Sequence, residues 1–218
     1  THPDQKALPK AEANGEEFRR LAEILADAGR LGAVLLQFPW SLRDGPAARD
    51  RIAMLRDRLA GLPVAVEVRH GGFGGEDWPR WLLARESVPV NVDQPLIGDS
   101  LPLTRWRGFG ASYFRLHGRN EATWFDRGAG RDARYDYLYA QDELTELTAA
   151  IATVAQEGPP VFVVANNHYL GQAPVVALQL KAHFTGRRIP LPPSLLPHYP
   201  PLAKIALAED GEQGDLFG

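Results

Sequence analysis

Short apolar runs that alternate with amphipathic segments are the feature that most constrains this fold. The run at 31–39 is too short and too apolar for a surface helix, and Pro39 stops it, so it is typical of a buried strand. The strands are expected at 31–39, 64–69, 88–93, 112–117 and 161–165. Helical spacing of apolar residues predicts helices over 16–28, 46–60, 77–85, 141–156 and 172–184. This alternation predicts an α/β fold with a parallel sheet covered by helices.

Alternation within the strands separates an apolar face from a polar one. Val66 and Val68 share one face of their strand, while Glu67 and Arg69 share the other. In two later strands the same alternation places polar residues, near the carboxyl end, on the face opposite to the apolar residues: Asn91, Asp93, Tyr113, Arg115 and His117. A closed barrel has a polar interior mouth of this kind, so we predict a TIM-barrel-like parallel sheet in which these groups share one pocket.

Barrel closure takes eight strands, and only five are visible. We therefore expect about three N-terminal strands to be missing from this chain, either because they precede Thr1 in the intact protein or because the chain is a fragment. Residues 1–189 are assigned to the barrel-like domain, and the proline-rich residues 190–218 to a C-terminal tail that wraps the surface and then loses order.

Composition excludes several classes of protein. The chain has no cysteine, which removes disulfides, thiol nucleophiles and iron–sulfur ligation. A net charge of −3 gives no overall attraction to nucleic acid or to anionic membranes. The absence of a long apolar run predicts a soluble protein with no membrane partner, and we expect a cytoplasmic location.

Several segments resemble the YecE-like family, a class described as a domain of unknown function. The resemblance covers about residues 1–185 and is carried by Gln37-Phe-Pro39, Glu67-Val-Arg-His70, Asp93, Arg115-Leu-His-Gly-Arg119, Tyr135-Asp-Tyr137 and Asn166-Asn167. It implies a fold similar to TIM barrels, with Thr1-His2 at the end of the third strand of that fold. It supplies no established reaction.

The polar strand ends include groups suited to proton transfer. Glu67, Asp93 and His117 are the expected catalytic residues, because carboxylates and imidazole exchange protons near neutral pH when burial tunes them. The alternative is that the two carboxylates only neutralise Arg69 and Arg115 in a buried structural network.

Arginines near the same strand ends predict an anionic ligand. Arg69, Arg115 and Arg119 can each bind a phosphate or carboxylate through paired hydrogen bonds. The remaining ligand-binding candidates are polar side chains at the same strand ends: Gln37, His70, Asn166 and Asn167. Ion pairing alone, or a turn at the two asparagines, is the alternative reading.

A divalent metal is left open, although no cofactor and no metal ligand is assigned. The groups that could hold one are Glu67, Asp93, His117, His70 and His2. Arginines among these groups argue against a metal, because they compete for the carboxylates.

Two features suggest contact with nucleic acid. The long loop after residue 117 carries aromatic residues that could stack on bases and arginines that could contact phosphates: Trp124, Phe125, Tyr135, Tyr137, Tyr139, Arg127, Arg131 and Arg134. Packing over the barrel mouth is the alternative role of these aromatic residues. In the tail, Gln213, Leu216 and Phe217 lie in a segment that resembles the short peptide by which bacterial repair proteins hold the sliding clamp.

These observations predict a hydrolase-like enzyme that acts on a phosphate-bearing anionic substrate at the carboxyl ends of the strands. One alternative is a nucleic-acid-associated repair or processing protein, recruited through its Gln-x-Asp-Leu-Phe tail. A second alternative is a ligand-binding protein without turnover.

Overall fold

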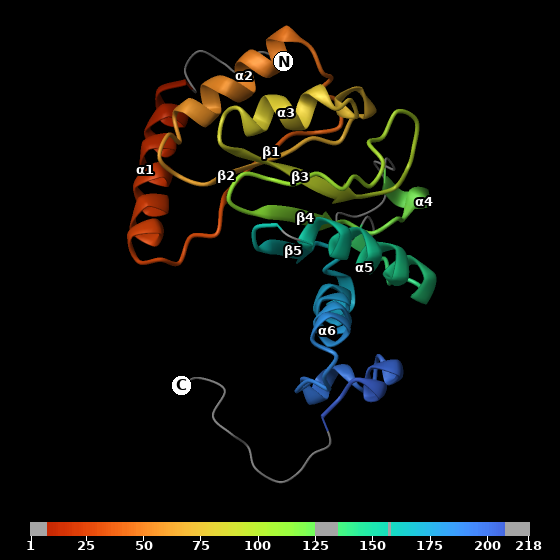
Figure 1. Cartoon of the computed structure of the whole chain (residues 1–218). Coiled ribbons are helices and arrows are strands. Elements are labelled where there is room, and N and C mark those ends of the chain that lie inside the picture. The colour runs from red at the N-terminus through yellow and green to blue at the C-terminus, as the bar shows by residue number, and fades with distance from the viewer. Residues whose placement is uncertain (1–7, 125–134, 157, 208–218) are drawn as a thin grey trace.

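The computed structural model describes residues 8–124, 135–156 and 158–207. Its five strands are β1 (Val34–Gln37), β2 (Val64–Glu67), β3 (Ser87–Asp93), β4 (Ser112–Leu116) and β5 (Val161–Ala165). All are parallel and lie in the order β1-β2-β3-β4-β5, which is the order of the chain (Figure 1). A parallel sheet in sequential order is the arrangement of a TIM barrel, and five strands make a curled half-barrel. The predicted fold class is confirmed.

The helices α2 to α5 lie between strands along the chain, whereas α1 precedes β1 and α6 follows β5. Their bounds are α1 (Leu8–Asp27), α2 (Pro46–Asp57), α3 (Asp77–Leu83), α4 (Glu121–Trp124), α5 (Gln141–Ala155) and α6 (Gln172–Thr185). In Figure 1, α2 and α3 lie on the β1 side of the sheet and α5 lies against β4 and β5. The expected strands and helices are confirmed, with ends that shift by a few residues except at α1, which begins at Leu8 rather than residue 16.

The convex face of the sheet carries the main hydrophobic core. Val64 and Val66 of β2 pack with Ile52 of α2 and Trp78 of α3. A second cluster joins β4 to α5 and α6 through buried side chains: Phe114, Leu116, Leu147, Ile151 and Val176. Burial of this apolar area holds the helices on the outside of the curled sheet.

The concave face is lined by the opposite set of strand residues. Ala65 pairs with Val88, Val90 with Tyr113 and Val92 with Arg115. Paired residues in register point to the same side of a sheet, so β3 presents valines to the concave face. On β5, Phe162 is 39% exposed and Val164 is 37% exposed. The concave face is therefore apolar over much of its area.

The apolar stripe of α1 is largely exposed. Phe18 and Leu21 are each 52% exposed and Leu25 is 46% exposed, whereas Ala22 is buried. The spacing identified the helix correctly, but the stripe does not face the described core.

The proline-rich segment folds back beside α6. It forms 3-10 helices over Pro193–Leu195 and Pro200–Lys204. Backbone pairing between Ile189 and Ala206 closes this segment into a loop. No helix in the described ranges is long and apolar enough to cross a membrane.

Candidate functional site

Glu67 and His117 occupy equivalent places at the ends of two different strands. Glu67 is the last residue of β2, and His117 directly follows β4. Both side chains are fully buried. Burial of a carboxylate is costly unless charged or hydrogen-bonding partners surround it, so the neighbours of Glu67 define the site.

Arg69 and His117 both contact one oxygen of Glu67. Arg69 Nε and Nη2 donate to Glu67 Oε1 at 3.0 and 2.9 Å. His117 Nε2 lies 3.0 Å from the same oxygen. The structure therefore brings Glu67, Arg69 and His117 into one buried cluster, as the sequence predicted.

The network assigns the protonation state of His117. Nδ1 lies 3.1 Å from Asn166 Nδ2, a donor, whereas Nε2 lies 3.0 Å from Glu67 Oε1 and 3.1 Å from Arg69 Nη2. Glu67 Oε1 is the one acceptor among these three neighbours, so the single proton of a neutral ring belongs on Nε2, which donates to Glu67, and Nδ1 accepts. Burial, reinforced by the charges of Arg69 and Arg115, lowers the pKa of His117 to about 4 although Glu67 opposes this shift. The imidazole is therefore neutral at neutral pH.

Glu67 remains ionised in spite of its burial. Desolvation alone would raise its pKa, but the hydrogen bond with His117 and the positive charges around it, which at neutral pH are those of Arg69 and Arg115, lower the pKa to about 2. With His117 neutral, two guanidinium groups face one carboxylate. The cluster carries one excess positive charge.

Arg115 also belongs to the cluster, but its Nε makes no hydrogen bond to Glu67. Its Nε lies 3.6 Å from Glu67 Oε2, close enough for an ion pair but too far for a hydrogen bond. Both atoms are buried, and neither has a hydrogen-bond partner among the described residues. The side chains of Arg69 and Arg115 are each 11% exposed, so they are the cationic groups through which a ligand could meet the cluster.

Gln37 and Asn166 border the cluster from the two edges of the sheet. Gln37 ends β1, is exposed and pairs in register with Glu67. Asn166 follows β5 and contacts His117. These two predicted ligand-binding residues therefore lie beside the cluster, although no described contact joins Gln37 to it.

The expectation that Asp93 shares this pocket is wrong. Asp93 pairs in register with Leu116, which packs against α5 on the convex face, whereas Val92 pairs with Arg115. The side-chain parity was right, but the valine side of β3 is the side that faces the concave mouth. Asp93 belongs to a second buried cluster.

This second cluster is organised by Arg119 and Tyr139. Arg119 Nε and Nη2 donate to Asp93 Oδ1 at 2.9 and 2.7 Å, and Tyr139 donates to Asp93 Oδ2 at 2.6 Å. The Tyr139 hydroxyl also accepts from Gly118 N at 2.9 Å. Burial raises the pKa of Asp93 although Arg119 and Tyr139 oppose the shift. Arg119 is thus held by an ion pair and is not directed at the first cluster.

Sequence reasoning did not identify the two acidic partners of Arg119 on α5. Glu146 Oε2 lies 2.9 Å and Glu143 Oε1 lies 3.6 Å from guanidinium nitrogens of Arg119. Their spacing of three residues places them on one helix face, which was the available signal. Their role is to fix the loop after β4 against α5.

His70 and Asn167 stabilise loops. His70 Nδ1 accepts from Gly72 N at 3.0 Å and caps the 3-10 helix Gly71–Phe73, while its ring lies 5.4 Å from that of Trp40. Asn167 is fully buried and donates to Tyr137 O at 2.8 Å. Neither side chain has a described contact with the Glu67 cluster.

Other predictions lie partly outside the described residues. In the described part of the chain, no group of three or more His, Asp or Glu side chains could hold a metal ion. The predicted contributors outside the described ranges are His2, Phe125, Arg127, Arg131, Arg134, Gln213, Leu216 and Phe217. Tyr135, in contrast, is described, and its ring lies against that of His168 in a tilted arrangement with the ring centroids 4.8 Å apart.

The fold and the charged strand ends define a half-barrel α/β protein of the TIM-barrel type. The family model described as "Protein of unknown function DUF72" matches residues 1–198, so the chain belongs to the DUF72 family. This is the family to which the YecE-like motifs pointed.

Relatives agree with this assignment. The UPF0759 protein YunF of Bacillus subtilis (strain 168) is 29% identical over 159 residues, or 67% of this chain and 55% of that protein. A DUF72 family crystal structure from Thermotoga maritima MSB8 is similar with a TM-score of 0.73 and 33% identity, covering 79% of this chain and 65% of that one. Another from Enterococcus faecalis V583 has a TM-score of 0.72 and 26% identity, covering 78% and 65%. The chain thus spans between about half and two thirds of the length of these relatives.

Proposed function

We propose that this chain binds a phosphate-bearing anion through Arg69 and Arg115 at the carboxyl ends of β2 and β4. The excess positive charge of the Glu67 cluster supports this proposal. Two arginines share one carboxylate, and Arg115 Nε has no hydrogen-bond partner among the described residues. A phosphate oxygen would supply the missing acceptor and neutralise the second guanidinium.

Glu67 and His117 support the arginines in this proposal. Because both are fully buried, an anion reaches Arg69 and Arg115 first. Glu67 fixes Arg69 by two hydrogen bonds, and neutral His117 keeps Glu67 in place without adding positive charge. A positioned guanidinium loses less side-chain entropy on binding.

We extend the proposal to phosphoester hydrolysis, the reaction predicted from the sequence. His117 is the neutral imidazole of the cluster, and it would take up a proton at Nδ1, the nitrogen that accepts from Asn166. An anion bound beside it would favour the protonated form. Asp93 is left out of this assignment, because it lies on the convex side of the sheet, where Arg119 and Tyr139 hold its carboxylate away from the Glu67 cluster.

Calorimetric titration with inorganic phosphate at low ionic strength tests binding. Arg115→Gln should weaken affinity about 10- to 100-fold, the range of one charge-assisted hydrogen bond. Arg115→Lys should restore part of it, because charge returns without the planar fork. Arg30→Gln, which removes an exposed arginine, is the control.

The proposal would be overturned if the folded chain bound no phosphate, or if the Arg115→Gln and Arg30→Gln variants bound phosphate with equal affinity. Phosphate release from p-nitrophenyl phosphate, compared between the unmodified chain and His117→Asn, tests the hydrolytic extension separately.

A further inference from the structure

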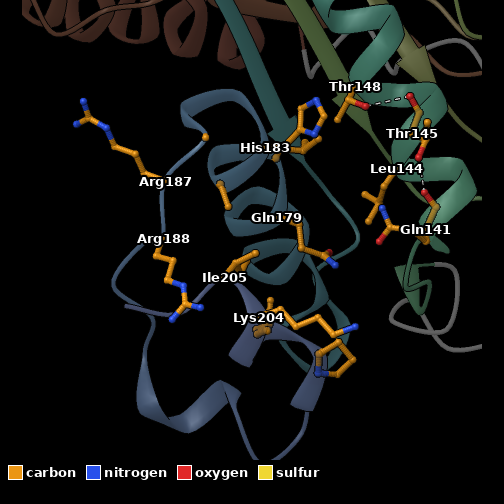
Figure 2. Close-up of a pocket in the computed structure, with 15 residues that line it drawn as sticks. Gln141, Leu144, Thr145, Thr148, Gln179, His183, Arg187, Arg188, Lys204 and Ile205 are labelled. Atoms are coloured by element: carbon orange, nitrogen blue, oxygen red, sulfur yellow. Dashed lines mark hydrogen bonds between the residues drawn. The ribbon is translucent and has the colours of Figure 1, made fainter. Parts of the chain in front are cut away.

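A cavity lies between α5, α6 and the 3-10 helix Pro200–Lys204, and none of its lining residues belongs to the Glu67 cluster. Its volume is about 490 Å³. Gln141, Thr145 and Thr148 line it from α5, and Gln179 and His183 line it from α6 (Figure 2). We call this cavity the α5–α6 groove.

The lining of the groove is basic. It includes Arg187, Arg188 and Lys204 and contains no Asp or Glu among the described residues. Figure 2 shows Lys204 extending across the gap toward the α5 side, in the same direction as Gln179, whereas Arg187 points away. The groove is therefore suited to a segment with negative charge.

The groove also has an apolar part and an unsatisfied acceptor. Leu144, Leu180, Leu202 and Ile205 contribute apolar side chains to the lining. Gln179 Oε1 is buried and has no hydrogen-bond partner among the described residues. An occupant that carries carboxylates, an N–H donor and large apolar side chains would match all three properties.

We propose that the α5–α6 groove binds the C-terminal segment of this same chain, residues 208–218. That segment contains Glu209, Asp210, Glu212 and Asp215 and has no Lys or Arg. It also contains Leu216 and Phe217, which supply the apolar side chains. Its composition is complementary to the groove in charge and in hydrophobicity.

The position of the segment favours binding within one molecule. Leu207 N donates to Ile189 O at 2.9 Å, and Lys204 and Ile205 line the groove, so the segment starts at its edge. Seven residues separate Leu207 from Asp215, enough for about 25 Å of extended chain. The part of α5 that lines the groove, Gln141 to Thr148, is only about 10 Å long. A tethered segment also has a high effective concentration at a nearby site.

Disulfide trapping in the full chain tests this proposal, because the chain has no native cysteine. Gly214→Cys is combined either with Thr145→Cys in the groove or with Thr153→Cys about 12 Å further along α5. Both threonines are exposed, and each hydroxyl donates to the carbonyl four residues earlier, so the two sites are matched. The Thr145 pair should form its intramolecular disulfide about tenfold faster than the Thr153 pair.

Two further changes separate docking from simple proximity. Lys204→Glu should slow trapping at Thr145 at least about threefold, whereas Lys181→Glu, on the exposed surface of α6 outside the groove, should not. Replacing Leu216 and Phe217 together by serine should also slow trapping at Thr145. Equal rates at the two threonines, or indifference to Lys204→Glu, would overturn the proposal. Disulfide-linked dimers in place of the intramolecular product would show that the groove binds a second copy and would overturn it as well.

Discussion

His117 Nε2 lies 3.0 Å from Glu67 Oε1, although the two residues are fifty positions apart and both side chains are fully buried. The parallel sheet brings the two residues together, because β2 and β4 flank β3 and their carboxyl ends lie at the same end of the sheet. A neutral imidazole beside an ionised carboxylate leaves the charges of Arg69 and Arg115 only partly compensated. The electrostatic balance of the site therefore depends on Glu67.

Glu67→Gln should destabilise the fold strongly. The substitution removes the carboxylate and leaves Arg69 and Arg115 nearly buried without a counter-charge. Loss of one member of a buried ion pair costs about 3–5 kcal/mol, measured by urea unfolding. Glu76→Gln breaks an exposed pair with Arg80 and should change stability little. Similar effects for the two variants would contradict the charge balance described for the cluster.

Stability should fall as the pH drops from about 6.5 to about 4. The pKa of His117 is about 4 in the folded chain, against 6.5 for an ordinary histidine, so the unfolded chain binds the extra proton in this window. The slope contributed by this residue is up to ~1.4 kcal/mol per pH unit. Urea unfolding at several pH values measures it.

Matched variants isolate the contribution of His117 to this slope. His117→Gln should reduce the slope, and His198→Gln, at an exposed position, should leave it unchanged. In the unmodified chain, nitrogen-15 NMR should show the His117 ring as the neutral Nε2–H tautomer at pH 5.5. A ring protonated at that pH would disprove the assignment.

Tyr139→Phe should cost about 2–3 kcal/mol. The hydroxyl of Tyr139 donates to Asp93 Oδ2 and accepts from Gly118 N, so its removal leaves two buried polar groups unsatisfied. Tyr137→Phe is the comparison, because the Tyr137 hydroxyl donates to Glu143, which also accepts from Ala140 N. Chemical denaturation should show the larger loss at Tyr139; the reverse order would place the structural role elsewhere.

Gly118→Ala should be more harmful than Gly110→Ala. Both glycines have positive φ, +83° and +68°, so both substitutions carry the left-handed penalty of about 1 kcal/mol. At Gly118 a Cβ would also lie 2.6 Å from Tyr137 Cβ, whereas at Gly110 nothing lies within 4 Å. The difference in thermal midpoint between the two variants measures the close approach alone. Equal midpoints would show that the loop can move away from Tyr137.

Hydrophobic periodicity was sufficient to predict the sheet and its helices. The apolar run at 161–165 corresponds to β5 residue for residue, because its length and its branched and aromatic residues favour a strand. The expected burial is wrong there, since β5 is the last strand of the sheet and leaves Phe162 and Val164 exposed. The same reasoning located α1 but not its orientation, since a stripe such as Phe18, Leu21 and Leu25 says nothing about what it faces. No capping signal was recognised at Leu8, so the start of α1 was not predicted.

The site was predictable only in part. The alternation of side chains along a strand predicted that Glu67 and Arg69 share one face, and that Arg115 and His117 share one face. Both pairs of residues meet on the concave side of the sheet. The side to which Asp93 points depends on the register between β3 and β4, which the sequence of one strand does not contain. The ion pairs that Arg119 forms with Glu143 and Glu146 likewise depend on how α5 packs against β4.

Every residue of β3 is buried, and the strand is paired with β2 on one side and β4 on the other. Its amide hydrogens should therefore be among the slowest in the described sheet to exchange with deuterium, while those of β1 and β5 exchange earlier. Glu67 and His117 extend from the two strands that border this slow centre. Thermal opening that begins at the rims of the sheet would thus leave their mutual geometry intact until the whole domain unfolds.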